Sequence, residues 1–331
     1  MFFESFIPYL IALICFPLII YHKEIGNATG LVDFPDDRKK HKKPIPKVGG
    51  IYILITTICT MLYFSNLYNE RFIISYFVIV IGLFFIGFID DKIEINATNR
   101  LIMQLIVTAI AITIDFNLNI TNLNIGIIDK KIQIFHASTF FTIFCVIALV
   151  NATNLVDGKD GLLGSIFLFF LIIFIYSMQN EFNYILISLL ISTILFLIYN
   201  IRGVIFLGNS GSYLIGGIMA FITIQSYNYE PFQIEIIFSI FYLFGLDMLR
   251  VYIERLLKGI SPFTAENNHL HHYIYNCFKN KLIAILTYMI LAIIPFVYQI
   301  FFTNFIIIIF LCFFIYIFSF LFFKKYNNSF E

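Results

Sequence analysis

The sequence predicts an all-α, polytopic membrane protein with about eleven transmembrane helices in a single domain over residues 1–331, and three observations support this fold class. Hydrophobic residues make up 60% of the chain and charged residues 12%, whereas soluble domains are about half apolar and a quarter charged. Long apolar runs divide the whole chain. Basic residues gather in alternate connections between these runs.

Each apolar run is expected to be a helix, because lipid offers the backbone no hydrogen-bond partner and a helix satisfies its own. The runs are too long and uniform for barrel strands, which alternate polar and apolar residues. The first is expected to be a retained helix, since no small-residue cleavage site follows it. In order, the runs lie near residues 5–22, 48–67, 72–90, 101–115, 138–155, 161–178, 182–199, 211–226, 232–249, 283–300 and 303–323.

The distribution of basic residues predicts the orientation of the chain. Only Arg71, Lys130 and Lys131 fall in one set of connections, and the other 18 of the 21 basic residues fall in the alternate set. The positive-inside rule places the basic-rich side in the cytoplasm, with the N-terminus outside and the C-terminus inside. The formal net charge of +1 gives no indication of a nucleic-acid partner.

Two adjacent acids, Asp90 and Asp91, end the apolar run IGFIDDK. They repel each other, and negative charge is unfavourable at the C-terminal end of a helix. A divalent cation or a basic partner would relieve this repulsion. The alternative is that the pair only terminates a helix at the membrane interface.

A second group of polar residues lies in NATNLVDGKDGLLG, residues 151–164, which supplies Asn151, Asn154, Asp157 and Asp160. Positions three apart are neighbours on a helical turn. Hard oxygen ligands of this kind suit Mg²⁺ rather than Zn²⁺. The alternative is a glycine-rich turn between helices.

Two further segments favour phosphate binding. In FLGNSGSYLIGG, residues 206–217, backbone N–H groups around Asn209 and Ser210 at a helix start are expected to cradle phosphate, although small residues also mediate helix packing. In SPFTAENNHLHHYI, residues 261–274, the three histidines His269, His271 and His272 suit contacts to phosphate oxygens or acid–base steps better than a zinc site.

The loop over residues 30–50 packs acids against basic residues and His41, then continues with Pro44, Pro46 and Gly49. The proline and glycine residues are expected to fix this loop against the membrane. The alternative is a charged loop attracted to anionic lipid headgroups. One hypothesis unites all five segments: a cytoplasmic phosphoryl-transfer site with one reactant from water and one from lipid. A transporter would instead place ionisable groups near the middle of the membrane.

From about residue 30 to 275, the chain resembles the polyprenyl-phosphate N-acetylhexosamine-1-phosphate transferases. The motifs are GLVDFPDDRKKHKKPIPKVGGI, FIDD, NATNLVDGKDGL, FLGNSGS, and LDMLRVYIERLLKGISPF with HLHH. The histidine motif and the proline–glycine loop favour the bacterial branch that transfers GlcNAc-1-phosphate from UDP-GlcNAc to undecaprenyl phosphate, rather than the related phospho-MurNAc-pentapeptide transferase.

The resemblance implies a reaction that gives UMP and a polyprenyl-diphosphate sugar. It implies Mg²⁺ as cofactor, with Mn²⁺ as the alternative, and a multi-pass protein of the bacterial inner membrane whose site faces the cytoplasm. It also favours a homodimer. The catalytic loops are expected near 23–47, 90–100, 151–160, 200–211 and 250–282. Whether the sugar is GlcNAc or a modified relative, and which cell-envelope polymer follows, stay open.

Residue roles follow from the same resemblance. Asp90 matches the first acid of the family's pair, which is proposed there to deprotonate or position the lipid phosphate, and Asp91 matches its partner. Asn154 and Asp157 match a motif for metal and nucleotide binding, which Asp160 completes. The three histidines match the motif that contacts the diphosphate and helps to select the amino sugar. The first loop contributes Asp33, Arg38, His41 and Lys47 near the lipid phosphate, and Arg255 matches a basic position in the last large loop.

One departure from the family pattern concerns the metal. The family usually has Asp at the position of Asn209, where the acid is a direct Mg²⁺ ligand. Asn keeps an oxygen donor but removes a negative charge, which should weaken cation binding. This departure has three interpretations: a less tightly held metal, a different sugar, or a homologue that binds its substrates without turnover.

Overall fold

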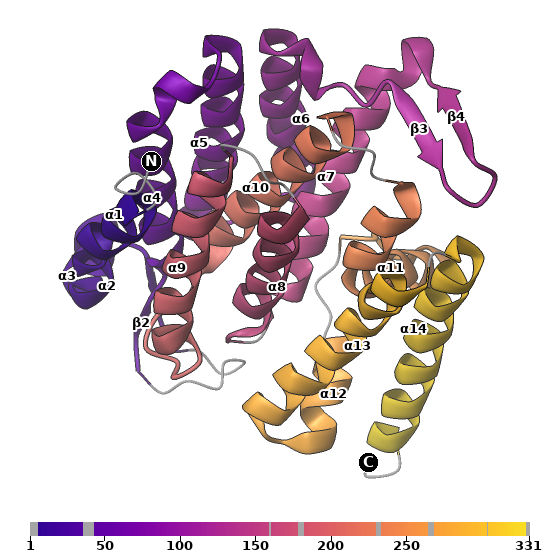
Figure 1. Ribbon diagram of the computed structural model, residues 1–331. Helices are drawn as coiled ribbons and strands as arrows, with labels where there is room; N and C mark the ends of the chain where they lie inside the picture. Colours follow the sequence, from indigo (N-terminus) through magenta and orange to yellow (C-terminus); the bar gives the residue numbers. More distant parts are fainter. Residues whose placement is uncertain are drawn as a thin grey trace. The chain divides into compact units, whose positions relative to one another are not determined.

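The computed structural model describes residues 6–35, 43–158, 160–177, 182–229, 233–263, 268–302 and 304–328. Two predicted site residues, Arg38 and His41, lie outside the described residues. The described chain is almost entirely helical, as predicted, and two short β-hairpins are additions that the sequence analysis did not expect (Figure 1).

Helices cover all eleven predicted runs, although the first is divided. The α-helices are α1 (Ile7–Cys15), α2 (Pro17–Ile20), α3 (His22–Thr29), α4 (Gly49–Tyr63), α5 (Glu70–Ile93), α6 (Ala97–Ile114), α7 (Ser138–Val156), α8 (Leu162–Ser177), α9 (Asn183–Asn200), α10 (Gly208–Tyr229), α11 (Ile234–Leu257), α12 (Leu270–Phe278), α13 (Lys281–Phe301) and α14 (Phe305–Asn328). Short 3₁₀ helices are η2 (Ser65–Leu67), η3 (Phe116–Leu118) and η4 (Phe135–Ala137). Strand β1 (Val32–Asp33) pairs antiparallel with β2 (Ile45–Pro46), and β3 (Asn122–Ile125) with β4 (Lys130–Gln133).

Seven helical segments among the described residues are long and apolar enough to cross a membrane. They are α5, α6, η4 with α7, α9, α11, α13 and α14. An eighth arises if α1–α2 and α3, which meet at a bend of 70°, form one span. The chain is therefore a multi-pass membrane protein, and the count of eleven spans stays a prediction.

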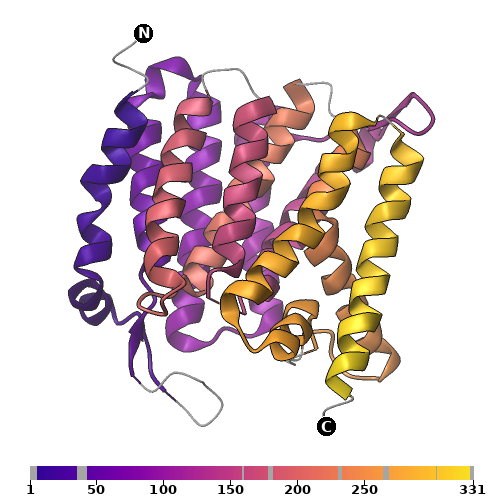
Figure 2. The same ribbon diagram turned by 60° about the horizontal axis from the view of Figure 1, so that its bottom comes forward.

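The chain forms two compact units, and the predicted single domain stays a prediction. Unit 1 comprises residues 1–118 and 145–222, and unit 2 comprises residues 119–144 and 223–331. In unit 1, α9 packs against α1, α4 and α8, and α5 packs along α6 (Figure 2).

Close backbone contacts in unit 1 bring three helices to one point. A Cβ atom added to Gly87 of α5 would lie 2.3 Å from the carbonyl oxygen of Asn209, and one added to Gly50 of α4 would lie 2.7 Å from Cα of Gly211. Small residues permit such close helix packing in membranes. The N-terminus of α10 is therefore fixed between the start of α4 and the end of α5.

Hairpin β1–β2 is joined to the same point by backbone hydrogen bonds. The N–H of Phe206 donates to the carbonyl of Pro46 at 2.8 Å, and the N–H of Gly49 donates to the carbonyl of Phe206 at 3.1 Å. Asp33 ends β1 and Lys47 follows β2, so the hairpin carries both side chains to the start of α10.

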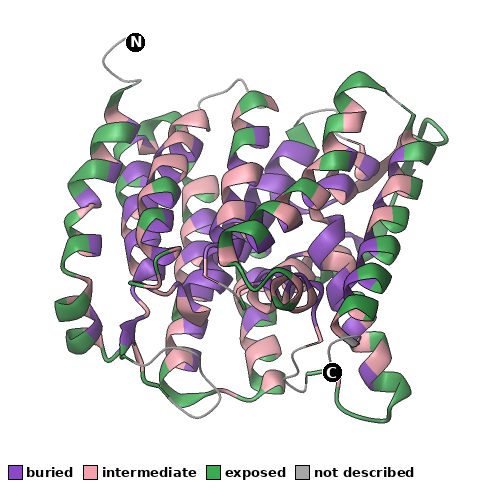
Figure 3. Cartoon of the chain, turned by 90° about the horizontal axis from the view of Figure 1, so that it is seen from below, coloured by how far each residue is buried: buried purple, intermediate pink, exposed green. Residues whose placement is uncertain are grey.

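Unit 2 is built from α11, α12, α13 and α14, which pack against one another, and from hairpin β3–β4. On α14, Ile308, Cys312, Tyr316 and Phe320 are buried at intervals of four residues, and much of the rest of the helix is exposed (Figure 3). This stripe packs against the rest of unit 2, and the exposed faces of α14 are apolar as well. At the hairpin, the buried carboxylate of Glu235 accepts from the N–H groups of Gly126 and Ile127, at 3.1 and 3.0 Å.

Candidate active site

The carboxylate of Asp91 binds the N-terminus of α10. It accepts from the backbone N–H groups of Asn209 at 3.0 Å and Ser210 at 2.9 Å, and only 1% of its side chain is exposed. The first N–H groups of a helix have no partner within the helix, and the helix dipole attracts negative charge there. The unfavourable position of Asp91 near the end of α5 is thus offset by the start of another helix.

Glycine is required beside this contact. Gly208 has a φ of +76°, and a Cβ atom there would lie 2.7 Å from the carboxylate of Asp91. A side chain at this position would meet both backbone strain and a clash. The glycine therefore permits the close approach between Asp91 and α10.

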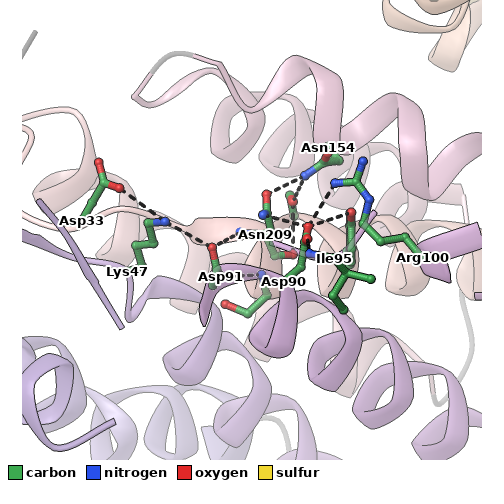
Figure 4. A network of polar contacts seen from close by, with 11 residues as sticks. Asp33, Lys47, Asp90, Asp91, Ile95, Arg100, Asn154 and Asn209 are labelled. Carbon is green, nitrogen blue, oxygen red and sulfur yellow. Dashed lines mark hydrogen bonds and ion pairs between the residues drawn. The ribbon is translucent and has the colours of Figure 1, made fainter. Parts of the chain in front are cut away.

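Asp90 has different partners from its neighbour (Figure 4). Its Oδ1 atom accepts from the N–H of Ile95 at 2.8 Å. Its Oδ2 atom accepts from three donors: Arg100 Nη1 at 3.1 Å, Asn209 Nδ2 at 3.0 Å and the hydroxyl of Tyr213 at 3.4 Å. Four donors thus surround the carboxylate of Asp90, whose side chain is only 3% exposed.

Each carboxylate of the pair also has its own basic partner, which is one of the two predicted ways to relieve their repulsion. Arg100 pairs with Asp90, and Lys47 Nζ lies 3.4 Å from Asp91 and 3.3 Å from Asp33. Arg100 was missed, although the short connection from α5 to α6 places it only ten residues after Asp90. The role predicted for Lys47 and Asp33, near the lipid phosphate, stays a prediction.

Asn209 links two of the predicted groups by its amide. Its Nδ2 atom donates to Asp90, and its Oδ1 atom accepts from Asn154 Nδ2 at 3.0 Å. Asn154 also donates to Ser212 Oγ at 2.9 Å. Asn151 turns toward α6 instead, where its Nδ2 atom donates to Gln104 Oε1 at 2.8 Å. Neither Gln104 nor Ser212 carried a signal that the sequence analysis used.

Asp157 and Asp160 follow α7 in the turn that leads to α8. Burial raises the pKa of Asp157 well above its usual value, the nearby carboxylates of Asp160 and Asp91 raise it further, and Lys47 partly opposes them. Asp160 and Asp91 thus both lie within electrostatic reach of Asp157. A bound cation would relieve the repulsion between these acids.

The side chains of this site can supply only some of the ligands of a metal ion. Among the described residues, no three side chains of His, Cys, Asp or Glu are close enough to hold a metal by themselves. Mg²⁺ usually takes one or two carboxylates, and waters and substrate phosphates complete its shell. The acids after α7 and the amide oxygens beside them suit that mode, in which cation and phosphate bind together.

The histidine motif belongs to unit 2 and is described there by itself. His269 and His271 are buried, and the ring centroids of His271 and His272 lie 4.2 Å apart. Arg255 is also buried and donates to the carbonyl of Pro262. Convergence of these residues with the acids of unit 1 stays a prediction.

Unit 1 thus brings together most of the predicted site residues. Comparison with known proteins indicates the function of such a site. The family model for glycosyl transferase family 4 matches residues 73–227. A Thermotoga maritima protein named undecaprenyl-phosphate alpha-N-acetylglucosaminyl 1-phosphate transferase is 31% identical over 272 residues, which cover 79% of this chain and 78% of that protein. The chain belongs to glycosyl transferase family 4. Further family 4 relatives with the same name come from Yersinia pestis, 30% identical over 76% of this chain and 71% of theirs, and Salmonella typhi, 27% identical over 77% and 72%.

Membership in family 4 confirms the family that the motifs predicted. The matched range contains the acid pair at the end of α5, the acids after α7 and the start of α10. The resemblance to the GlcNAc-type branch is supported as well, because all three relatives carry that name.

Proposed function

We propose that the chain transfers GlcNAc-1-phosphate from UDP-GlcNAc to undecaprenyl phosphate, with release of UMP. The observation that carries this proposal is the acid pair Asp90–Asp91 fixed at the start of α10, with Asp157 within electrostatic reach. The relatives' printed names support the acceptor and the transferred group.

In this proposal, Asp157 and Asp160 hold Mg²⁺ or Mn²⁺ together with the donor diphosphate, and the amide oxygens of Asn154 and Asn209 supply neutral donors. When bound there, the cation would supply positive charge that stabilises the diphosphate and the leaving UMP. The residues of the chain would orient the two phosphates in line and exclude water between them.

Asp90 is the proposed base or positioning group for the lipid phosphate. Its two oxygens already accept four hydrogen bonds, so a contact to the lipid phosphate has to replace one of these donors. An anionic lipid phosphate that pairs with Arg100 would remove one of these donors. Lys47 can exchange Asp91 for phosphate in the same way. In this proposal, binding of the acceptor places its phosphate beside Asp90 in exchange for existing contacts of Arg100 and Lys47.

The proposed site faces the cytoplasm of the bacterial inner membrane. The support is the 18-to-3 division of basic residues between alternate connections, which also predicts the N-terminus outside and the C-terminus inside. Eleven spans belong to this proposal, as does a homodimer. A cytoplasmic site meets a soluble UDP-sugar and a lipid acceptor at the same surface.

The test measures UMP release by the purified protein from UDP-GlcNAc, undecaprenyl phosphate and Mg²⁺. The wild-type protein should turn over, and Asp90→Asn should lower kcat by roughly 10²-fold or more, the range for loss of an acid–base group. Asp129→Asn is the matched control, because Asp129 is an exposed acid between β3 and β4. Donor binding without UMP release would instead favour the second candidate, a non-catalytic homologue, which Asn209 motivates.

A further inference from the structure

A buried carboxylate in unit 2 has no role in the proposal above. Asp247 of α11 is 4% exposed and lies in a helix apolar enough to cross a membrane. A buried charge in such a helix is costly unless it is paired and hydrogen-bonded. Asp247 is both: its partners are Arg250 on the same helix and residues at the start of α12 and on α14.

The first set of contacts joins Asp247 to the histidine motif. Oδ2 of Asp247 lies 2.9 Å from His269 Nδ1, and the backbone N–H of Leu270 donates to both carboxylate oxygens, at 3.1 and 3.2 Å. His269 is the N-cap residue of α12 and provides no side-chain cap itself. Asp247 therefore supplies the acceptor at the start of α12 that the local sequence lacks.

The second set holds the carboxylate in place. Arg250 Nη2 lies 2.9 Å from Oδ1 of Asp247, and the hydroxyl of Tyr316 on α14 donates to the same atom at 3.1 Å. Arg250 also pairs with Glu254 at 3.0 Å and lies over the ring of Phe320, 4.1 Å from its centroid. The ion pair with Arg250 keeps Asp247 an ionised acceptor in its buried place.

An ionised carboxylate accepts hydrogen bonds and donates none. Nδ1 of His269 must therefore carry a proton, so Nε2 is the nitrogen that can act as an acceptor when the ring is neutral. His271 and His272 lie on the first turn of α12. By holding the start of this helix, the same carboxylate also positions the backbone that carries their rings. The ring centroids of His269 and His271 are 5.6 Å apart with an interplanar angle of 11°.

We propose that Asp247 is a positioning residue for the histidine motif: it selects the Nδ1–H form of His269 and anchors the start of α12. This inference rests on the proposed function, in which the histidines contact the donor diphosphate. Asp247 itself touches no substrate in this proposal. Its effect reaches the donor only through His269 and α12.

The kinetic test compares Asp247→Asn with Tyr316→Phe. Both remove a hydrogen bond within the same buried cluster, but only the first changes the acceptor of His269. Asp247→Asn should lower kcat/KM for UDP-GlcNAc roughly 10- to 100-fold, the range for loss of a partner that orients an imidazole. The KM for undecaprenyl phosphate should stay within about threefold. Tyr316→Phe should change neither constant by more than about threefold.

A double-mutant cycle with His269→Gln separates positioning from a general loss of structure. If Asp247 acts through His269, Asp247→Asn should add little to the loss caused by His269→Gln. Fully additive losses in kcat/KM, or a folded Asp247→Asn variant with wild-type kinetics, would overturn the inference.

A readout that needs no turnover keeps the inference separate from the proposed function. In protein with ¹⁵N-labelled histidines, of which the chain has six, His269→Gln assigns the ring signals of His269. The wild-type spectrum should show the Nδ1–H form, and Asp247→Asn should alter it while Tyr316→Phe leaves it unchanged. An Nε2–H form in the wild type would refute the inference. Absence of UMP release would refute only the proposed function.

Discussion

Replacement of Asn209 by Asp tests how the acid pair is held in this chain. Asn209 Nδ2 donates to Oδ2 of Asp90 at 3.0 Å, and the substitution puts a carboxylate oxygen in place of that donor. The contact from Asn154 to the other oxygen can remain. The change therefore converts one hydrogen bond into a repulsion and leaves its surroundings intact.

The cost follows from two effects. Loss of a hydrogen bond to a charged group costs about 1.5–3 kcal/mol. Two like charges at this separation repel by about 5 kcal/mol at an effective dielectric constant near 20. Protonation of one carboxyl at pH 7 limits the total, because it costs about 4 kcal/mol from an ordinary pKa. Without a cation, Asn209→Asp should therefore destabilise the protein by about 2–4 kcal/mol, and the loss should shrink as the pH falls.

The assay is thermal unfolding of the detergent-purified protein in EDTA and in Mg²⁺. Asn209→Asp should unfold at a lower temperature than the wild type in EDTA and should gain more stability from Mg²⁺. It should also need less Mg²⁺ for turnover. Asn99→Asp, an exposed position on the first turn of α6, controls for the added charge. Equal stability in EDTA, or equal shifts with Mg²⁺ in variant and wild type, would refute this reasoning.

Three further substitutions probe the same unit. Arg100→Gln leaves the buried Asp90 without its basic partner, so the free energy of unfolding should fall by about 3–5 kcal/mol. A variant as stable as the wild type would contradict the pairing. Asp157→Asn removes a group whose pKa is raised in the folded state. Because the unfolded chain ionises this group at lower pH than the folded chain does, the raised pKa costs stability from the ordinary pKa upward. The variant should therefore be inactive yet more stable in EDTA at neutral pH. This gain should vanish on acidification, and a pH-independent gain in the unfolding midpoint would argue against the raised pKa. Gly87→Ala puts a Cβ atom 2.3 Å from the carbonyl of Asn209, so it should cost about 1–3 kcal/mol and lower UMP release, and an unchanged kcat would contradict the close approach.

The helices were predictable from the sequence because apolar runs in lipid have few other structures open to them. Each of the eleven runs lies within a helix or a bent series of helices. Hydropathy did not settle how many of them span, since buried and lipid-facing helices are equally apolar. The hairpin β3–β4 was not predictable either, because buried Glu235 binds its turn through backbone N–H groups that carry no sequence signal.

The candidate site was predictable as a set of residue types but not as a set of contacts. Acids and amides that follow separate apolar runs indicated one phosphate chemistry. That Asp91 binds the start of α10, and that Arg100 rather than another base pairs with Asp90, depends on how helices distant in sequence approach one another. The contact of Asp247 with His269 was not predictable, because one acid in an apolar run gives no indication that it orients a histidine.

The central claim is that the acids after α7 hold one divalent cation together with the nucleotide sugar. Electron paramagnetic resonance of Mn²⁺, titrated into the purified protein with UDP-GlcNAc, measures this directly. The account predicts about one bound Mn²⁺ per chain, with affinity lost in Asp157→Asn and kept in Asp129→Asn. Equal Mn²⁺ binding by the wild type and Asp157→Asn would contradict it.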